Sequence, residues 1–279
     1  MNKINDRLKK LKGNCSKCFG LCCVALFCSK TDGFPKDKEA GKPCINLQDD
    51  FKCKVHEDLN KKGYRGCIAY DCFGAGQMIS QATFKGESWN DENKDKMFQC
   101  FLIVRQICEM MHYLLQALKY QENNKIKSEI ENVINETEKL IKSDTDSLLK
   151  IDLIVHRSKV NKLLKKTSDE FKHKFNKSNV NTLSKMKRIA GRLNLIASDL
   201  KKINLVGQDL SGALLIAADL KGCDLSGCDL LGADLRDANI CSADLSRSIY
   251  ITQTQINSAI GNKDTKLPEN IIRPTERWI

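Results

Sequence analysis

Cysteines carry the clearest chemistry in this 279-residue chain, because nine of its fourteen cysteines lie before residue 73. They begin with the spacing C-x2-C-x3-C-C and continue at wider intervals: Cys15, Cys18, Cys22, Cys23, Cys28, Cys44, Cys53, Cys67 and Cys72. Thiolates bind zinc and iron–sulfur clusters, and one structural zinc ion or one cubane cluster takes four of them. The spacing of Cys15 and Cys18 lets both sulfurs reach one metal. The pattern therefore predicts a metal-binding head.

Eight of these cysteines are the predicted metal ligands: Cys15, Cys18, Cys22, Cys23, Cys44, Cys53, Cys67 and Cys72. Because Cys22 and Cys23 are adjacent, placing both on one tetrahedral ion would strain the backbone. They suit two metals or one polynuclear cluster better. Zinc and an iron–sulfur cluster stay open as alternative cofactors. His56 is a further candidate ligand, although a histidine beside a cysteine is as often structural.

A disulfide framework or redox-active thiols are the alternatives to metal binding. The basic N-terminus precedes an apolar run at Phe19 to Phe27, which is too short to span a membrane and contains Cys22 and Cys23. The run also lacks the features of a cleavable signal. We therefore expect a cytoplasmic protein without a membrane segment, in a reducing compartment that disfavours disulfides.

A second pattern positions a different kind of element near the C-terminus. Leucine recurs every five residues from Leu200 to Leu235, and Ile240, Leu245 and Tyr250 continue the series. A small residue usually stands two positions before each centre, Asp or Asn one before, and glycine often two after. A short fixed period predicts a solenoid, in which stacked units complete one core. We expect the centres and the small residues to point inward, the glycines to adopt positive φ, and Ser226 to be exposed.

The A(D/N)LXX signature of these eleven units resembles the pentapeptide-repeat family. The resemblance implies a right-handed quadrilateral β-helix with four repeats per coil, so the tail would form slightly under three coils, roughly 15 Å tall at the strand spacing. Some family members protect DNA gyrase by imitating DNA with a long acidic rod. Here the tail from Leu195 has nine Lys and Arg against eleven Asp and Glu, a net charge of −2. Topoisomerase protection, and with it antibiotic self-resistance, is therefore an alternative rather than the favoured function.

The N-terminal spacing is similar to the zinc- or iron-chelating cysteine-cluster domain over roughly Asn14 to Gln77. His56 replaces an aromatic residue of that family, and the run from Tyr70 to Gln77 lies outside its pattern. The two domains together resemble bacterial proteins with a cysteine-rich front and a pentapeptide-repeat tail. The cysteine-cluster domain also occurs fused to a flagellin lysine methyltransferase, so an iron–sulfur enzyme or an accessory to modification chemistry is a further alternative. Since no catalytic constellation stands out, the question of an enzyme stays open.

Helical patterns fill the segment between these two regions. Apolar residues at helical spacing predict helices at 97–120, 124–142 and 147–175. A short helix from Asn179 to Ile196 is expected to cap the open end of the solenoid. Core packing is the favoured role for Cys100, Cys108 and His112, because free cysteine is commonly buried.

Charge is distributed unevenly along the chain. The net charge is +11, so the first 194 residues carry +13. From His156 to Arg192 there are twelve Lys and Arg against two Asp and Glu, with Phe171 and Phe175 as the interleaved aromatic residues. Such a run could face nucleic acid, but a solvated helix face in a lysine-rich protein is favoured. We expect weak nucleic-acid binding or none.

The sequence thus predicts a multidomain α+β protein with three parts. These are a cysteine-rich metal-binding domain at 1–90, an α-helical domain at 91–194, and a β-helix with a C-terminal cap at 195–279. The predicted function is a metal-binding interaction protein that docks to a protein partner through its repeat tail. The oligomeric state is left open.

Overall fold

The computed structural model describes residues 2–176, 180–274 and 278. It divides into two compact units, Met1–Leu164 and Lys165–Ile279, with the division inside one long helix. The sequence-based boundaries after residues 90 and 194 differ from this division. The cysteine-rich segment and most of the helical segment form one unit, and the end of the long helix belongs with the repeats.

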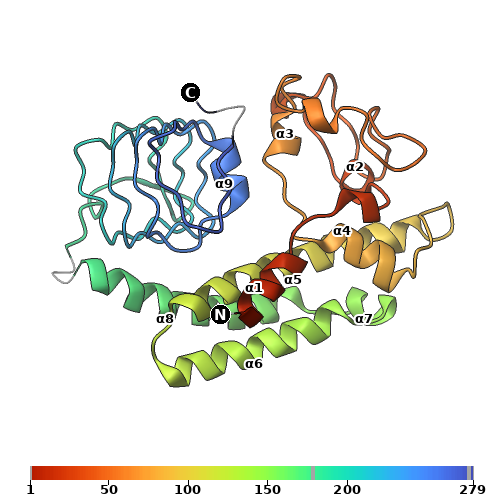
Figure 1. The fold of residues 1–279 in the computed structure, drawn as a ribbon, viewed down its shortest axis with the longest axis horizontal. Helices are drawn as coiled ribbons and strands as arrows, with labels where there is room; N and C mark the ends of the chain where they lie inside the picture. Colours follow the sequence, from red (N-terminus) through yellow and green to blue (C-terminus); the bar gives the residue numbers. More distant parts are fainter. Residues whose placement is uncertain (1, 177–179, 275–277, 279) are drawn as a thin grey trace. The chain divides into compact units, whose positions relative to one another are not determined.

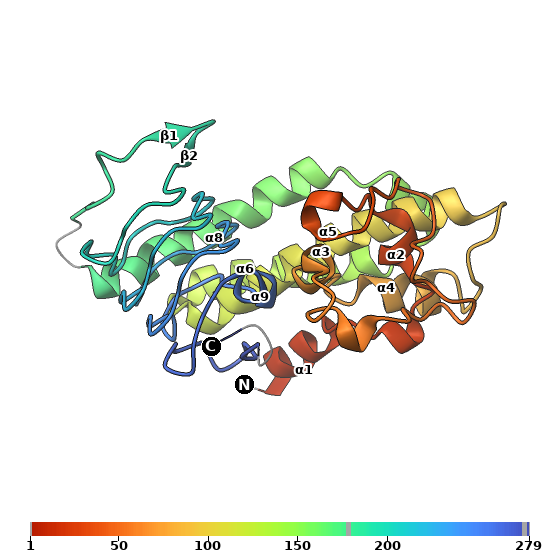
Figure 2. The ribbon, with the colours of Figure 1, turned by 90° about the horizontal axis from the view of Figure 1, so that it is seen from above.

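The first unit is built around helix α5, Lys94–Tyr120. It contacts α1 (Asn2–Lys10) and α6 (Asn124–Ile141), and α6 runs alongside it (Figures 1 and 2). The prediction of helices at 97–120 and 124–142 is therefore confirmed. Cys100 and Cys108 are fully buried on α5, as expected. Burial also lowers the pKa of His112 to about 4, and its Nε2 lies 2.7 Å from Gln116 Nε2 in a contact within the same helix.

The helix expected at 147–175 is interrupted. Helix α7 covers Thr145–Leu149 and α8 covers Leu153–Phe175. The side chain of Asp152 accepts hydrogen bonds from the backbone N–H groups of Ile154 and Val155, both at 3.0 Å. This is N-capping, which satisfies N–H groups that the first turn of a helix leaves unpaired. A local polar residue therefore starts a new helix inside an otherwise continuous apolar pattern.

The cysteine-rich segment consists of short elements joined by loops. They are η1 (Cys15–Lys17), α2 (Leu21–Ala25), η2 (Lys30–Asp32), η3 (His56–Asp58), α3 (Arg65–Ile68), α4 (Ala75–Met78) and η4 (Ile79–Thr83). Both α2 and α4 contact α5. The loops have a small core of their own, made by Phe34, Val55 and Tyr64. A core of this size leaves much of the loop geometry to other interactions.

The second unit contains the repeat solenoid. Parallel bridges join residues twenty apart, such as Asn194 with Leu214 and Leu214 with Asp234, so four pentapeptides complete one coil. Figure 2 shows these coils as successive stacked loops. The central side chains are 0–1% exposed from Leu200 to Tyr250, which confirms their inward assignment. The glycines two positions after the centres have positive φ, for example +63° at Gly212, as expected.

Asp and Asn before each centre stabilise the turns of the solenoid. In successive repeats this side chain accepts a hydrogen bond from the backbone N–H two residues later, as Asp219 does from Lys221 at 3.1 Å and Asp224 from Ser226 at 2.8 Å. Such Asx turns supply a local partner for corner amides. The recurrent Asp and Asn are thus part of the scaffold and not a catalytic set.

The solenoid extends further than its sequence motif. Asn239 pairs with Ile260 and Asp244 with Lys266, at separations of 21 and 22 residues. The extra residues accommodate α9, Gln253–Ser258. The amide of Gln255 donates to two carbonyls of the preceding coil, at 2.8 and 3.0 Å. The expectation of slightly under three coils is therefore too short, because backbone pairing continues after the five-residue pattern has ended.

The start of the solenoid differs from the expected helix at Asn179 to Ile196. Position 179 lies outside the described residues, and the part from residue 180 onward contains an antiparallel hairpin of β1 (Arg188–Ile189) and β2 (Arg192–Leu193) (Figure 2). The turn residues Ala190 and Gly191 have φ of +48° and +77°. Two successive residues with positive φ form the type of tight turn that joins hairpin strands, and they cannot continue an α-helix.

The end of α8 packs on one face of the solenoid within the second unit. The Ser168 hydroxyl donates to Asp229, and Lys172 Nζ contacts Asp209 at 3.0 Å. A Cβ on Gly227 would lie 2.5 Å from the Phe175 ring, so only glycine allows this approach. Ser226, next to Gly227, is 1% exposed. The expectation that Ser226 is exposed is wrong, because this face of the repeats is covered.

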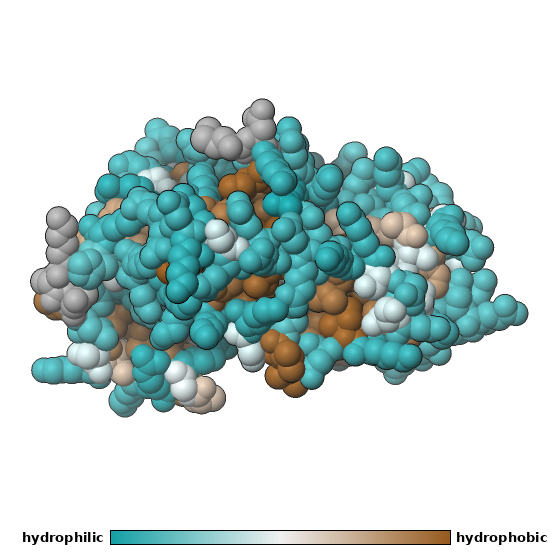
Figure 3. All heavy atoms as spheres, turned by 90° about the horizontal axis from the view of Figure 1, so that it is seen from below, coloured by the Kyte–Doolittle hydropathy of each residue, from teal (hydrophilic) through white to brown (hydrophobic). Residues whose placement is uncertain are grey.

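The molecular surface is largely hydrophilic on the face drawn in Figure 3, with separate hydrophobic areas. Some large apolar side chains are exposed in each unit, including Ile154 at 79% and Ile196 at 45%. None of the helices in the described part of the chain is both long and apolar enough to cross a membrane.

The solenoid core yields a first prediction. Leu220→Asp places a carboxylate in a dry interior and removes a buried leucine, so the free energy of unfolding should fall by at least about 3 kcal/mol. Lys221→Asp introduces the same side chain one residue later at an exposed position and should be tolerated. Denaturant titration of both variants measures the difference, and equal stability would contradict the inward packing.

Asp229 yields a prediction about pH. Burial raises its pKa from 3.8 to about 6, and the hydrogen bond from Ser168 opposes this only in part. The ionised carboxylate therefore costs stability above pH 6, and the folded protein recovers this stability by taking up a proton as the pH falls from 6 to 4. Asp229→Asn should stabilise the protein at pH 7 by up to about 3 kcal/mol, with the gain disappearing near pH 4.

The measurement is the difference in unfolding free energy between Asp229→Asn and the unaltered protein at pH 7 and pH 4. Asp224→Asn is the matched control, since Asp224 has the same position in its repeat but is exposed. It should give no stabilisation. Destabilisation by Asp229→Asn at pH 7 would show that the ionised carboxylate contributes to folding.

Candidate metal centre

One cavity of about 320 Å³ in the first unit is surrounded by thiols. Its lining includes all nine cysteines that precede residue 73: Cys15, Cys18, Cys22, Cys23, Cys28, Cys44, Cys53, Cys67 and Cys72. We call it the cysteine cavity. All eight predicted ligands are on its walls, together with Cys28, which the sequence analysis left out of the ligand set. The nine cysteines, which are spread over residues 15 to 72 of a loop-rich segment, thus line one cavity.

Glycines bring two distant cysteines together on one side of the cavity. A Cβ on Gly76 would lie 2.7 Å from Cys18 Sγ and 4.0 Å from Cys72 Sγ, and one on Gly13 would lie 3.4 Å from Cys72 Sγ. Gln77 fastens this region, because its side chain accepts from Asn14 N at 2.9 Å and donates to the Lys12 carbonyl at 2.8 Å. The run from Tyr70 to Gln77, which lies outside the family pattern, therefore helps to build the cavity.

The small core of Phe34, Val55 and Tyr64 supports the other side of the cavity. Three cysteines pack against this core: Cys28, Cys53 and Cys67. Cys28 is paired with Lys38 and Cys53 with Leu47 in antiparallel bridges. Cys44 is tied to α2, because its N–H donates to the Cys23 carbonyl at 2.9 Å. Backbone pairing between loops thus sets the position of these thiols.

Helix α2 carries Cys22 and Cys23, whose sulfurs are 4.0 Å apart. The fourteen cysteines of the chain are all free thiols. Within the described part of the chain, no three His, Cys, Asp or Glu side chains are arranged to hold one metal ion. The thiols surround a space and do not meet at a point, so metal ligation here requires side-chain rotation toward the cavity.

Burial dominates the electrostatics of the cavity. Together with a smaller contribution from the nearby Cys22 thiol, it raises the pKa of Cys15 and Cys18 to about 11 and that of Cys67 to about 12. These three thiols are therefore protonated at neutral pH when no cation is near. A bound metal cation would replace these protons, since thiolates are the metal ligands. Metal affinity at such a site rises with pH.

The polar groups that line the cavity are more consistent with a ligand site than with an empty apolar cavity. The Tyr70 hydroxyl is buried and has no hydrogen-bond partner among the described residues. Tyr70 and Asp71 both line the cavity, and burial raises the pKa of each. His56 lines the cavity and is exposed, and it stays open as a ligand. Nine thiols suit a thiophilic metal centre, and the buried Tyr70 hydroxyl can hydrogen-bond a group bound in the cavity.

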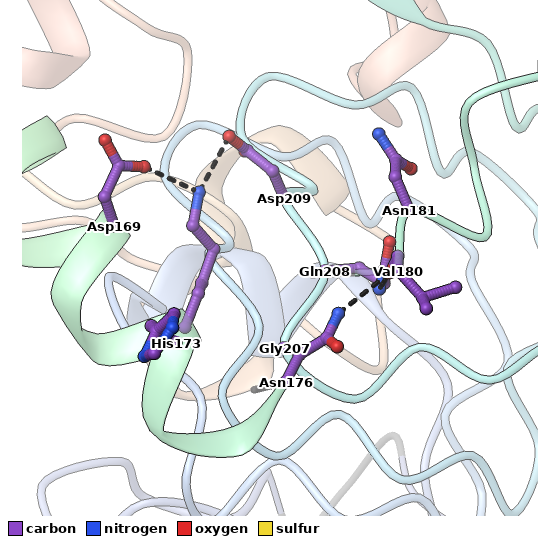
Figure 4. Close-up of a pocket in the computed structure, with 9 residues that line it drawn as sticks. Asp169, His173, Asn176, Val180, Asn181, Gly207, Gln208 and Asp209 are labelled. Atoms are coloured by element: carbon purple, nitrogen blue, oxygen red, sulfur yellow. Dashed lines mark hydrogen bonds and ion pairs between the residues drawn. The ribbon is translucent and has the colours of Figure 1, made fainter. Parts of the chain in front are cut away.

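A second pocket, of about 410 Å³, lies in the second unit beside the end of α8 (Figure 4). Lys172 Nζ lies between Asp169 at 3.2 Å and Asp209 at 3.0 Å, as the dashed lines show. Gln208 and Asn176 both donate to the Val180 carbonyl at 2.8 Å. These polar groups bind one another, which indicates a structural role. The basic run from His156 to Arg192 thus includes a lysine that is ion-paired, and its residues 177–179 lie outside the described residues.

Cys28 and Tyr70 line the cavity but are not among the ligands predicted from the sequence. Cys28 lies five residues after Cys23, so the density of the cysteine run was the available signal. No local pattern in the sequence marks Tyr70, because its position at the cavity depends on contacts with helix α5, which is distant in sequence. Arg105 of α5 lies 5.8 Å from the Tyr70 ring centroid and donates to the Asp71 carbonyl at 3.4 Å.

Known proteins resemble this chain in two ways. Residues 192–227 and 209–247 match the family described as "Pentapeptide repeats", with 8 copies. Over 266 residues the chain is 48% identical to the "Uncharacterized protein YybG" of Bacillus subtilis (strain 168), and the match covers 95% of this chain and 94% of that protein.

Two solved structures are similar to part of the chain. The pentapeptide repeat protein Rfr23 from the cyanobacterium Cyanothece 51142 is 31% identical, and the match covers 26% of this chain and 56% of that chain, with a TM-score of 0.21. The pentapeptide repeat protein alr5209 from Nostoc PCC 7120 is 27% identical, and the match covers 32% and 85% of the two chains, with a TM-score of 0.12.

Proposed function

This chain is a pentapeptide-repeat protein and belongs to the same family as YybG of Bacillus subtilis, and from that premise we propose that it is a metal-binding interaction protein. The cysteine cavity is the metal centre, and the repeat solenoid is the surface that docks to a protein partner. Zinc and an iron–sulfur cluster are the two candidate cofactors, because both accept an all-thiolate ligand set.

The observation that carries the metal proposal is the gathering of nine cysteines around one cavity. They come from several short elements and from loops, and backbone bridges and close glycine contacts hold them there. The donor set by itself suits a soft metal. Disulfides or redox-active thiols would need only pairs, which does not account for so large a set at one site.

The docking proposal depends on the surface of the solenoid. Stacked repeats provide an extended rigid surface, which repeat proteins commonly use for binding. The end of α8 occupies the face that includes Asp209 and Asp229. Residues at equivalent positions of successive coils stack into columns on the surface, and other columns have exposed charged side chains. Lys201 pairs with Asp219 at 2.9 Å, and Arg236 pairs with Asp234 at 2.7 Å. A protein partner is proposed to bind these uncovered columns.

Metal analysis tests the first part of the proposal. Anaerobic purification followed by elemental analysis and a visible spectrum should show bound zinc without colour, or a brown iron–sulfur protein. Replacing Cys15 and Cys18 together by Ser should lower the metal content and the thermal stability of the first unit. The expected loss in unfolding free energy is about 2.7 kcal/mol for a metal present at 100 times its Kd.

Cys241→Ser is the matched control for this measurement. Cys241 is a partly exposed free cysteine on the solenoid, far in sequence from the cysteine cavity. This variant should keep its metal and its melting temperature. Full metal content and unchanged melting in the Cys15 and Cys18 double variant would exclude these two residues as ligands.

A supercoiling assay separates docking from gyrase protection. The repeat tail has a net charge of −2, and α8 covers one of its faces, so it offers a poor imitation of a long acidic duplex. The full chain should therefore give no protection of DNA gyrase against a quinolone. Clear protection at stoichiometric concentrations would favour gyrase protection over docking to another protein partner as the function of the repeat tail.

A further inference from the structure

One residue that lines the cysteine cavity has a polar atom whose hydrogen bonding is not satisfied. The hydroxyl of Tyr70 is buried and has no hydrogen-bond partner within residues 2–176, 180–274 and 278. Buried tyrosine hydroxyls usually have a partner, because an unpaired polar atom destabilises the folded protein. Tyr64 shows the usual arrangement in the same segment, since its hydroxyl accepts a hydrogen bond of 2.9 Å from Asn46 Nδ2. The unpaired hydroxyl of Tyr70 therefore requires an explanation.

The position of Tyr70 in the chain places it between two thiols of the cavity. Cys67 precedes it by three residues and Cys72 follows it by two. The backbone N–H of Tyr70 donates to the Cys67 carbonyl at 3.3 Å, and the N–H of Ala75 donates to the Cys72 carbonyl at 3.0 Å. Both cysteines line the same cavity as Tyr70. The tyrosine thus shares one short hydrogen-bonded segment with two candidate ligands.

Helix α5 holds the tyrosine ring in place. The guanidinium of Arg105 lies 5.8 Å from the centroid of the Tyr70 ring and 5.6 Å from that of the Phe73 ring. Arg105 is fixed in turn by Glu109, whose carboxylate accepts a hydrogen bond of 2.7 Å one helical turn later. A cation beside an aromatic ring attracts it and restricts its movement. The hydroxyl is therefore kept in its buried position.

The surroundings of the hydroxyl indicate which acceptor it would bind. Solvent does not reach this oxygen, so a group of the cavity wall has to serve as the partner. The wall offers nine sulfurs, and the sulfur of a neutral thiol is a weak acceptor. A metal-bound thiolate carries negative charge and accepts a much stronger hydrogen bond. Metal binding by the cavity thiols would therefore supply a suitable acceptor.

We propose that the Tyr70 hydroxyl donates a hydrogen bond to a metal-bound cysteine sulfur of the cysteine cavity and thereby strengthens metal binding. This inference rests on the proposed metal-binding function and goes beyond it by assigning a role to a residue that is not a ligand. Tyr70 is a positioning residue, because it acts on the metal through the sulfur. Partners of metal ligands fix the orientation of those ligands and tune the metal, in zinc sites and in iron–sulfur clusters alike.

Tyr70→Phe tests the proposal because it removes the hydroxyl and keeps the ring beside Arg105. In the reduced, metal-free full chain the melting temperature should be unchanged or higher, since the variant no longer buries an unpaired polar atom. The affinity for Zn²⁺, measured anaerobically by competition with a chromophoric chelator, should fall about 10-fold or more. A hydroxyl with a purely structural role would give the opposite pattern, a lower melting temperature and an unchanged affinity.

Co²⁺ provides a readout at the sulfur itself. Cobalt bound to thiolates absorbs light by charge transfer from sulfur to metal. A hydrogen bond to the sulfur lowers the energy of its lone pairs and so raises the energy of this transition. The charge-transfer band of Co²⁺-loaded Tyr70→Phe should therefore lie at longer wavelength than that of the unaltered protein. An unchanged band would overturn the contact between the hydroxyl and a bound sulfur.

Tyr64→Phe is the matched control. Tyr64 is also a buried tyrosine of the cysteine-rich segment, but its hydroxyl is already paired with Asn46. This variant leaves the Asn46 amide without its partner, so the melting temperature of the metal-free chain should fall. The Zn²⁺ affinity of the folded protein and the Co²⁺ band should stay as they are in the unaltered protein. The two tyrosines are thus expected to give opposite results in stability and in metal binding.

The outcomes separate this inference from the function on which it rests. Absence of bound zinc, cobalt and iron from the unaltered protein would overturn the proposed function itself. Metal binding by the unaltered protein, with the same Zn²⁺ affinity in Tyr70→Phe, would overturn the role of the hydroxyl and leave metal binding in place. A lower melting temperature of metal-free Tyr70→Phe would also overturn it, because the hydroxyl would then be paired before the metal binds.

Discussion

The gathering of nine thiols around one cavity is the constraint on which the cysteine-rich segment of the first unit depends. The loops that carry them have a small apolar core of Phe34, Val55 and Tyr64, and much of the rest of their order comes from backbone bridges and glycine contacts. Burial raises the pKa of several of these thiols, to about 11 at Cys15 and Cys18 and about 12 at Cys67, so these three stay protonated in the absence of a cation. Loop order and the chemistry of the cavity are therefore coupled, since a metal would both neutralise the thiolates and link the loops.

The second unit depends on a different constraint, the twenty-residue coil. Once four pentapeptides close a coil, each repeat must present a leucine-like side chain and a small neighbour to the interior, and turn residues to the corners. The outer surface is free to vary. This freedom allows α8 to occupy one face through Ser168 and Phe175, at the cost of a buried carboxylate at Asp229 with a raised pKa. The remaining columns keep their charged residues exposed.

Several features could be predicted because they depend on local patterns. The helices at 97–120 and 124–142 follow from apolar periodicity, and the inward leucines follow from the five-residue period. Two expectations were wrong because backbone conformation and backbone pairing, and not side-chain periodicity, decide the structure there. The hairpin at 188–193 forms because Ala190 and Gly191 adopt positive φ, and the last coil continues through Ile260 without the motif because backbone pairing does not require a particular side chain.

The sequence by itself determined the repeat architecture, the helical core and the identity of a thiol-rich segment, since each is written in spacing along the chain. Only the tertiary structure decided which cysteines face one cavity, that Cys28 belongs with them, and that Ser226 is buried. The physical reason is that these properties depend on contacts between residues far apart in sequence. The approach of Gly76 to Cys18 spans 58 positions, and that of Gly227 to Phe175 spans 52, so no local pattern records either.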